Sequence, residues 1–587
     1  MTTPLTGTAR APRGEAAARP HDGPPAAVVR SLTGGGPAAL TLVLALLGPL
    51  LAALVLRRDA WPVTSDSVAQ QSIVQTWLSA AGHDVTYLPP DTWLLKVPLY
   101  AAVEALPLAP ATRLLVESAV LAVVALVAAA WATWELADQA GLRAARTRLG
   151  VLLPFAWFGT LSGGVGSYLV GMPNSRNIEL GLALVVIALA GRRPAGPCPS
   201  RHMPGRTAAT TVLIRVAAAG GAAILLAVLW VDDPYVAYLV GLPLALAAAA
   251  WFARPADRGG RDPRLIVLAA TLLASLGIAA LIRTLMPAAG VRLVVDGTAP
   301  TLDPADLLRH LGILPAASAG ELGFAEHGLA AHVAHLLAAA VLALAVVSAA
   351  AVTVRGWRRG RLAVAFLGVH WLVVVAGVLA DRTVYDFHAA RYLVLALIDL
   401  AACLGLGVAL LHERLRAAAA RVDRLRLGGP GLDRVATGLV ALAVGANLAS
   451  AALDDPMRPS EVTAGRREQQ AVLRVLTAQA DDGATKGFGP FWTADLYTHL
   501  SGGRVLLSDV VCDRGVLRTR NWLTDTARLR VTAQRSVVVV PPSAPELRGC
   551  TPETIAARLG GAARRFVTPG GTTVLVFDHD VTASIER

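Results

Sequence analysis

Apolar runs of about 20 residues, the length of helix that crosses the hydrocarbon core of a bilayer, recur along most of this chain. Hydrophobic residues make up 55% of the 587 residues and charged residues only 16%. We therefore expect a polytopic α-helical membrane protein. We assign eleven transmembrane helices, at 37–56, 111–135, 149–170, 174–190, 211–231, 235–253, 265–286, 328–354, 362–380, 391–411 and 435–453.

The basic residues between these helices predict the orientation of the chain. Lys and Arg concentrate in the cytoplasmic loops of membrane proteins. The tail 1–36 and every second loop after it carry 25 Lys and Arg, whereas the alternate loops carry 7. The amino terminus is thus predicted to be cytoplasmic, and the segment after Leu453 to be extracytoplasmic. The preference for Arg over Lys favours a GC-rich, actinobacterial source, and the expected location is the bacterial plasma membrane.

Composition divides the chain into three regions. Residues 1–36 combine Pro, Gly and Ala with four arginines and predict a disordered cytoplasmic tail. Residues 37–455 form the predicted transmembrane domain. Residues 456–587 carry frequent charges and short β-rich runs such as "SVVVVPP" (Ser536–Pro542). This last region predicts an extracytoplasmic α/β domain.

The first outer loop, 57–110, is too long and too apolar for a plain connection. Ser65–Ala80 and Asp91–Leu106 each have the pattern of a helix lying in the membrane interface. Trp77 would lie at the level of the lipid headgroups. Asp91 is a plausible N-cap of the second helix.

The net charge of +12 does not indicate a nucleic-acid partner, because the arginines are dispersed between the apolar runs. No His and Cys cluster in the sequence has metal-ligand spacing, so we predict no metal site, and a requirement for a divalent metal stays open. Cys512 and Cys550 are the two cysteines of the predicted exported domain. We expect them to form a disulfide, since the outer compartment permits one; the alternative is two buried thiols.

Ionisable residues at membrane depth are functional candidates, because an unpaired charge there is costly. Asp66 opens the first outer loop and could deprotonate an acceptor hydroxyl as a general base. Its alternative role is to cap the helix that follows it, in competition with Ser65. In "PNSRNIELG", Arg176 could hold a phosphate that Glu179 orients, or the two could form a structural ion pair.

The remaining candidates lie in two other outer loops. In "DRTVYDFHAARY", Arg391 could bind a lipid phosphate through two hydrogen bonds, with His388 and Asp386 beside it. The alternative for Arg391 is that its guanidinium extends from the end of a transmembrane helix to the lipid headgroups. Asp232 and Asp233 precede a proline, and turn chemistry alone also explains them.

Several of these features together resemble the GT-C superfamily of membrane glycosyltransferases. They are "TSDSVAQQ" with Asp66, the long first outer loop, "PNSRNIELG", and an exported carboxy-terminal region that contains "GFGPFWTADLYTHLSGGRVLL" (Gly487–Leu507). The resemblance implies that a sugar moves from a polyprenyl-phosphate carrier to an extracytoplasmic lipid, glycan or protein acceptor. It makes Asp66 the catalytic acid or base, and Arg391 with Arg176 the ligands of the donor phosphate.

The chain departs from the pattern of this superfamily in two ways, and two other function classes remain open. This chain has one Asp in the first-loop motif where many members have an acidic pair, and "VDDP" is only a loose candidate for a second acidic motif. One alternative is a transporter or flippase of a lipid-linked substrate, for which paired charges deep in mid-span would be the sign. The other is a non-catalytic membrane scaffold of the cell envelope. Sugar identity, acceptor and stereochemical course stay open.

Overall fold

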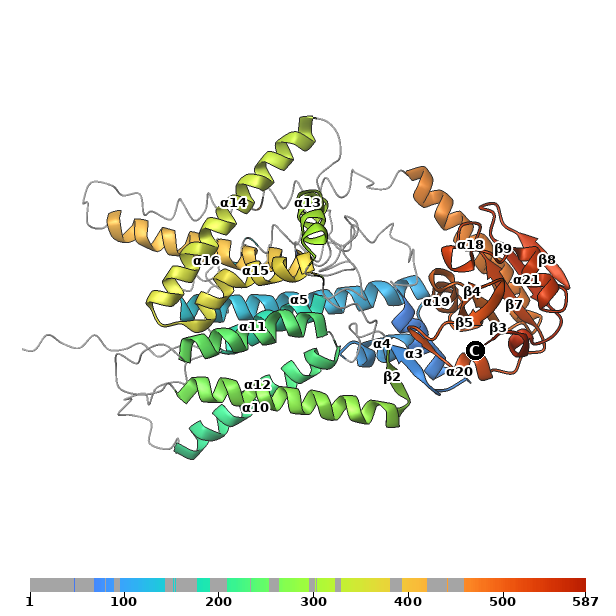
Figure 1. Cartoon of the computed structure of the whole chain (residues 1–587), viewed down its shortest axis with the longest axis horizontal. Coiled ribbons are helices and arrows are strands. Elements are labelled where there is room, and N and C mark those ends of the chain that lie inside the picture. The colour runs from blue at the N-terminus through green and yellow to red at the C-terminus, as the bar shows by residue number, and fades with distance from the viewer. Residues whose placement is uncertain are drawn as a thin grey trace, which may run out of the picture.

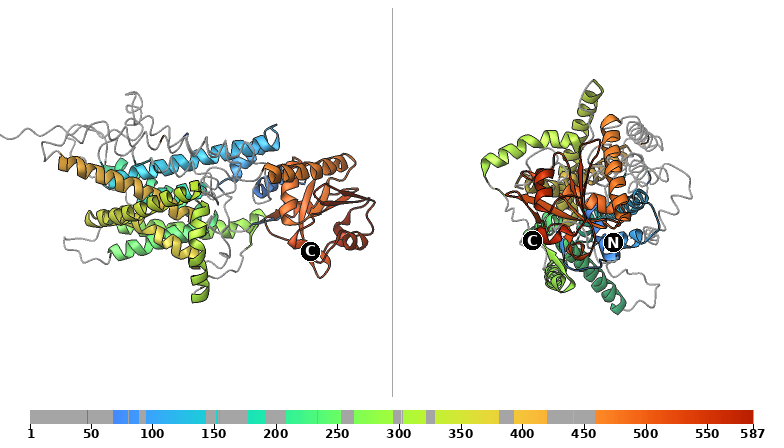
Figure 2. Two further views of the ribbon diagram at one scale, coloured as in Figure 1. Left: turned by 90° about the horizontal axis from the view of Figure 1, so that it is seen from above. Right: turned by 90° about the vertical axis from the view of Figure 1, so that its right-hand side faces the viewer.

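The computed structural model describes residues 47, 68–79, 81–88, 95–142, 151–152, 154, 177–190, 208–232, 234–252, 263–294, 301, 303–321, 329–380, 393–419, 441 and 459–586. These residues form a bundle of long helices at one end of the long axis and an α/β domain at the other (Figure 1). Short elements of the first outer loop lie between the two, in the view of Figure 1 and from above (Figure 2).

Eight described helices of the bundle overlie predicted transmembrane helices. They are α5 (Pro110–Gln139), α9 (Asn177–Ala190), α10 (Ala208–Asp232), α11 (Pro234–Phe252), α12 (Pro263–Leu285), α14 (Leu329–Arg358), α15 (Leu362–Ala380) and α16 (Val394–Ala419). A further helix, α13 (Pro304–Glu321), lies in a stretch that we expected to be an outer loop.

Five of these helices are long and apolar enough to cross a membrane: those that contain Thr112–Gln139, Ile266–Ala289, Ala339–Arg358, Leu362–Ala380 and Val394–Arg414. Their outward surface carries large exposed side chains such as Leu273 (70% exposed) and Val347 (65% exposed), which suits contact with lipid. The structure thus supports a membrane-embedded protein, and the total of eleven transmembrane helices remains a prediction. The expected spans 37–56, 149–170 and 435–453 lie almost entirely outside the described residues.

Contacts between helix ends divide into two groups, one at each end of the bundle, and the side of the membrane that each end faces remains a prediction. At one end, Ala227 of α10 and Ala279 of α12 pack in one cluster with Ile73 of the first outer loop. At the other end, Arg359 Nη1 donates to the carbonyl of Ala140 (2.9 Å) and Gln139 Nε2 donates to that of Ala188 (2.8 Å). The first group holds ends predicted to be outside, and the second holds ends predicted to be inside.

Small residues allow the helices of the bundle to pack closely. A Cβ added at Gly368 of α15 would lie only 2.1 Å from Oγ1 of Thr353 on α14. Such close approach of helix backbones is typical of membrane bundles, where packing rather than water exclusion holds helices together. The core of the bundle is contributed mainly by α5, α9, α15 and α16.

The carboxy-terminal region folds as the predicted α/β domain around one six-stranded sheet, in the order β5-β4-β3-β7-β9-β8. The strands β3, β4 and β7 run parallel, and the other pairs are antiparallel. The helices α18 and α19 cover one face, and α21 covers the other. The elements are α18 (Pro459–Asp481), β3 (Lys486–Gly489), α19 (Phe491–Leu500), β4 (Leu506–Asp513), β5 (Val516–Thr519), α20 (Ala527–Arg530), β7 (Ser536–Val540), α21 (Pro552–Arg558), β8 (Arg564–Val567) and β9 (Thr573–Phe577).

The disulfide predicted in this domain is present. Cys512 on β4 is bonded to Cys550, which precedes α21, with an S–S distance of 2.04 Å. The bond links the sheet to the loop that leads into a helix of its second face.

A small three-stranded sheet connects the α/β domain to the rest of the chain. Strand β1 (Thr86–Leu88) of the first outer loop pairs with β2 (Val291–Leu293), which follows α12. On its other side β1 pairs with β6 (Thr524–Asp525) of the carboxy-terminal domain. Backbone hydrogen bonds therefore join three segments that are far apart in the sequence.

The first outer loop forms helices in both segments where we expected them, and one of the two is buried within the protein. They are α3 (Ala69–Leu78) and α4 (Val97–Glu104), and eight of the ten residues of α3 are buried. The carboxy-terminal domain and the bundle cover α3 from opposite sides, and Trp77 donates its Nε1–H to Asp525. The position of these helices at the membrane interface remains a prediction. Asp91 lies outside the described residues.

Candidate functional site

Helix α3 lies at the centre of a buried polar junction between the bundle and the carboxy-terminal domain. Ser72 Oγ donates to Oδ1 of Asp495 on α19, at 2.6 Å. Arg528 Nη1 donates to the same carboxylate oxygen at 2.7 Å, its Nε donates to Thr76 Oγ1 at 2.8 Å, and its Nη2 bonds Ser72. Asp495 and Arg528 are each 1% exposed. The domain thus binds α3 through a charge pair that water does not reach.

The carbonyl of Leu507 on β4 completes the coordination of Arg528, accepting from Nη1 at 3.0 Å. Burial raises the pKa of Asp495, although Arg528 and the Ser72 hydroxyl oppose that shift. A buried charge pair of this kind is held together by hydrogen bonds that satisfy its remaining donors and acceptors. Any substitution that removes one partner would leave the other charge buried and unpaired.

A second group of polar residues lies beside the first, around Gln75 of α3. Gln75 Nε2 donates to Glu104 Oε2 at 2.7 Å, and Arg113 Nη1 donates to the same oxygen at 2.5 Å. Gln75 Nε2 is also 3.2 Å from His499 Nδ1. Burial lowers the pKa of His499 to about 3, so the ring is neutral and its contact with Glu104 at 3.6 Å is no ion pair. Burial raises the pKa of Glu104, and the bonds from Gln75 and Arg113 oppose it.

Two further buried contacts join the first outer loop to the bundle. Gln71 donates to Glu117 of α5 at 2.8 Å. Lys96 Nζ lies 3.1 Å from Glu179 Oε1, and both side chains are fully buried. Glu179 lies in the first turn of α9, so this ion pair holds the start of α9 against the first outer loop.

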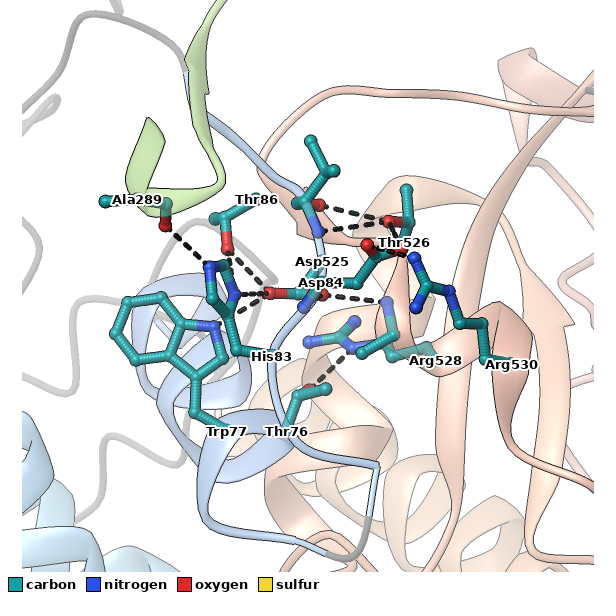
Figure 3. A network of polar contacts seen from close by, with 12 residues as sticks. Thr76, Trp77, His83, Asp84, Thr86, Ala289, Asp525, Thr526, Arg528 and Arg530 are labelled. Atoms are coloured by element: carbon teal, nitrogen blue, oxygen red, sulfur yellow. Dashed lines mark hydrogen bonds and ion pairs between the residues drawn. The ribbon is translucent and has the colours of Figure 1, made fainter. Parts of the chain in front are cut away.

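Asp525 is the centre of a third network, at the small sheet (Figure 3). Its Oδ2 accepts from Trp77 Nε1 (2.8 Å) and Thr86 Oγ1 (2.6 Å), and lies 2.8 Å from His83 Nδ1. His83 Nε2 lies 2.9 Å from the carbonyl oxygen of Ala289. Desolvation raises the pKa of Asp525, but these hydrogen bonds outweigh it and the pKa is lowered.

The pair of His83 and Asp525 predicts a pH dependence of stability. Desolvation lowers the pKa of His83, but the Ala289 carbonyl and Asp525 outweigh it, so the folded-state pKa is raised above 6.5. The stabilisation from the His83 and Asp525 pair is therefore complete below about pH 6.5, the pKa of an unperturbed histidine. It is lost as the pH rises through the raised pKa of His83 in the folded state. Since His83 is about one-third exposed, we expect at most about 1 kcal/mol, or roughly 2 °C in the unfolding midpoint, between pH 6 and pH 8.5.

Thermal unfolding of the full chain in lipid nanodiscs would measure this effect, with His83→Gln as the matched variant. Asp84, which Arg530 pairs with, faces the same ring and stays in place in both proteins. A pH profile that is identical in the two proteins would show that His83 carries no linked proton.

The structure places one of the predicted substrate-binding side chains inside this junction. Glu179 is there, and its described partner is Lys96. The role of Glu179 in orienting a phosphate held by Arg176, and its pairing with Arg176, stay predictions. Asp232 is the last residue of α10, and its side chain is not described. The other candidates lie outside the described residues: Asp66, Arg176, Asp233, Asp386, His388 and Arg391.

The capping role considered for Asp66 and Ser65 does not fit the helix. Helix α3 begins at Ala69, and its N-cap is Val68, which makes no side-chain cap hydrogen bond. Neither Asp66 nor Ser65 therefore occupies the N-cap position of α3. The general-base role is the one that stays a prediction.

The sequence contained two signals for the residues that we missed. Asp495 and His499 are four apart within "GFGPFWTADLYTHLSGGRVLL", so both lie on one face of α19. That face meets α3. Lys96 is one of two lysines in the chain and stands within an apolar stretch, which also marked it as a buried partner.

Among the residues that the structure describes, no group of three or more His, Cys, Asp or Glu side chains is placed to hold a metal ion. No protein-family model and no curated protein matches this chain.

Proposed function

We propose that this protein is a membrane glycosyltransferase. It moves a sugar from a polyprenyl-phosphate donor to a lipid, glycan or protein acceptor on the extracytoplasmic side. The observation that carries this proposal is the burial of α3. The helix that follows Asp66 is fixed between the bundle and the carboxy-terminal domain by the contacts of Ser72, Gln75 and Thr76.

A fixed α3 suits catalysis by a carboxylate near its start. A general base must lie within hydrogen-bond reach of the acceptor hydroxyl, and its position must be held by rigid neighbours. The donor carries a phosphate, for which arginine is the preferred ligand. We assign the base to Asp66 and the phosphate contacts to Arg391 and Arg176. The ion pair of Lys96 and Glu179 supports this scheme because it holds the start of α9, which follows Arg176 in the sequence, against the first outer loop.

Purified full chain in lipid nanodiscs would test the proposal. Polyprenyl-phosphate hexoses and pentoses, labelled in the sugar, serve as donors, and extracted envelope lipids and glycans serve as acceptors. We expect the release of polyprenyl phosphate together with a labelled product, whose anomeric configuration reports inversion or retention. A membrane scaffold would release none with any donor.

One observation favours a second function, a proton-linked transporter or flippase of a lipid-linked substrate. His370 Nδ1 on α15 lies 2.8 Å from Asp399 Oδ2 on α16, and both side chains are fully buried. His370 is at the middle of Leu362–Ala380. Ionisable pairs at such depth are typical of proton relays in transporters.

Replacing Asp399 with Asn separates the two functions. The variant keeps a hydrogen-bond acceptor for His370 but cannot carry a proton. We expect sugar transfer to stay within about two-fold of wild type, since the pair lies among helices remote in sequence from Asp66, and expect no lipid flipping by either protein. Flipping of a fluorescent polyprenyl-phosphate lipid across liposomes by wild type, with its loss in Asp399→Asn, would instead establish the transporter.

A further inference from the structure

Residues at the carboxyl ends of β3 and β7, and one residue within the neighbouring strand β4, gather at one edge of the large sheet. Strand β3 ends at Gly489, opposite Asp509 of β4, and Phe491 follows two residues later. Strand β7 ends at Val540, and Glu546 lies in the short helical turn after it, which packs against β4. Because β4 and β7 lie on opposite sides of β3, this edge is the switch point of the sheet, where open α/β sheets bind their ligands.

Buried polar atoms at this edge lack hydrogen-bond partners within the described part of the chain. They are both carboxylate oxygens of Asp509, Oε2 of Glu546 and Nε1 of Trp522. Asp509 is 3% exposed. Native proteins pair nearly all such atoms, so an unpaired group calls for water or a ligand. The three residues come from different segments, which makes a shared partner the simplest explanation.

Aromatic rings and one arginine surround these polar atoms. The rings of Phe491 and Trp522 meet edge to face at 4.7 Å, and the guanidinium carbon of Arg520 lies 4.9 Å from the ring of Trp522. The backbone N–H of Arg520 donates to the backbone carbonyl of Asp509 at 3.0 Å, and the positive charge of Arg520 acts on the carboxyl of Asp509. Trp492 contacts Phe491 at 5.1 Å and is 44% exposed, so an aromatic face is open at the rim.

Burial acts on the carboxyl of Asp509. It raises the pKa of Asp509 to about 8; Arg520 opposes the shift, and Asp495 and Glu546 add to it. The edge thus presents two acidic side chains, an indole N–H and a guanidinium beside aromatic rings.

From this constellation we infer that the carboxy-terminal domain binds a saccharide at the edge formed by Asp509, Glu546, Arg520, Trp522 and Trp492. A sugar hydroxyl donates and accepts, so neighbouring hydroxyls can satisfy carboxyl oxygens and the indole N–H together. The C–H face of a sugar ring suits an exposed tryptophan. An anion would meet two acidic side chains, and a divalent cation would meet the positive charge of Arg520, so neither fits as well.

This site shares no residue with the transfer site around Asp66 that we propose. Phe491 and Trp522 also pack in one cluster with Ala69 and Ile73 of α3, so the saccharide would be held beside the first-loop helix. The expected ligand is a glycan segment presented on the same side as the domain. Binding at this edge is measured without transfer, so either proposal can fail alone.

The test uses full chain in nanodiscs, because many detergents carry sugar headgroups. Labelled protein is applied to an array of immobilised hexose and pentose oligosaccharides, and each soluble form that binds is titrated by tryptophan fluorescence. We expect Trp492→Ala to weaken binding about five-fold through loss of stacking, and Asp509→Asn about ten-fold through the changed hydrogen bond. Asp481→Asn, an exposed carboxylate on α18, serves as the matched control and should bind as wild type does.

Binding of no oligosaccharide by wild type would overturn the inference. So would binding that neither variant weakens. Because Trp492 is exposed, Trp492→Ala should not disturb folding. This variant therefore still tests the inference if Asp509→Asn misfolds. Titration with Ca²⁺ in sugar-free buffer is the third arm: a fluorescence change that Asp509→Asn abolishes, without any saccharide binding, would assign the edge to a cation instead.

Discussion

Replacing Arg528 with Leu should destabilise the full chain by about 3–5 kcal/mol, the usual cost of removing one partner of a buried ion pair. The substitution leaves Asp495 charged and buried, and removes the donors that satisfy Thr76 and the carbonyl of Leu507. Because these partners belong to α3 and to the carboxy-terminal domain, we expect the two parts to separate first. Thermal unfolding in nanodiscs, with limited proteolysis of the loops around α3, would report the loss.

Two further variants determine whether the buried pair causes the effect. Arg564→Leu removes an exposed arginine of the same domain, which lies 3.5 Å from Asp482, and should change stability by no more than about 0.5 kcal/mol. Combining Arg528→Leu with Asp495→Leu removes both charges and should recover part of the lost stability. Equal stability of Arg528→Leu and wild type would show that the junction does not hold the domain.

The parts of the fold that the sequence predicted depend on local pattern. Runs such as Leu362–Ala380 are apolar for the length of a span, so they became helices at nearly the expected residues. "SVVVV" became the buried strand β7 because β-branched residues favour a pleated surface covered on both faces. The pairing of Cys512 with Cys550 followed from there being only two cysteines in the carboxy-terminal region.

The parts of the fold that the sequence could not predict depend on contacts between segments that are far apart in the chain. Trp77 and Asp525 are hydrogen-bonded although they are 448 residues apart, and no local pattern records such a pair. Helix α3 resembles an interfacial helix because its polar and apolar residues are mixed. In the structure its polar residues are matched instead by Asp495, Glu104 and Glu117, each from a different helix. An amphipathic pattern reports that two faces differ but not what covers them.

The same limit applies to the candidate site. Glu179 was recognisable as an ionisable residue at a helix start, but Lys96 as its partner depends on how two outer loops meet. Asp495 and His499 shared a helical face, and only the position of α3 showed what that face contacts. The sequence alone therefore identifies ionisable side chains that could act in a site, and tertiary contacts determine which of them have a structural role.

Replacing Asp66 with Asn should lower the rate of sugar transfer by about 10²–10⁴-fold, the usual contribution of a general base. Asn keeps the size of the side chain but cannot accept the acceptor's proton. Stability should change by no more than about 0.5 kcal/mol, since the N-cap of α3 is Val68 and makes no cap hydrogen bond with its side chain. The labelled-donor assay in nanodiscs gives the rate, and unfolding of the same preparation gives the stability.

A second substitution, Asp66→Ser, distinguishes the base from a helix cap. Asn and Ser are both good caps, so under a capping role both variants would keep transfer and stability. Under the base role both lose transfer, while Asp481→Asn, on the exposed surface of the α/β domain, keeps it. Donor binding should survive in both Asp66 variants, because the phosphate contacts are assigned to Arg391 and Arg176. If Asp66→Asn transferred sugar at the wild-type rate, another residue would have to take the proton, and two of the carboxyl groups that contact α3, those of Glu104 and Glu117, would be tested next.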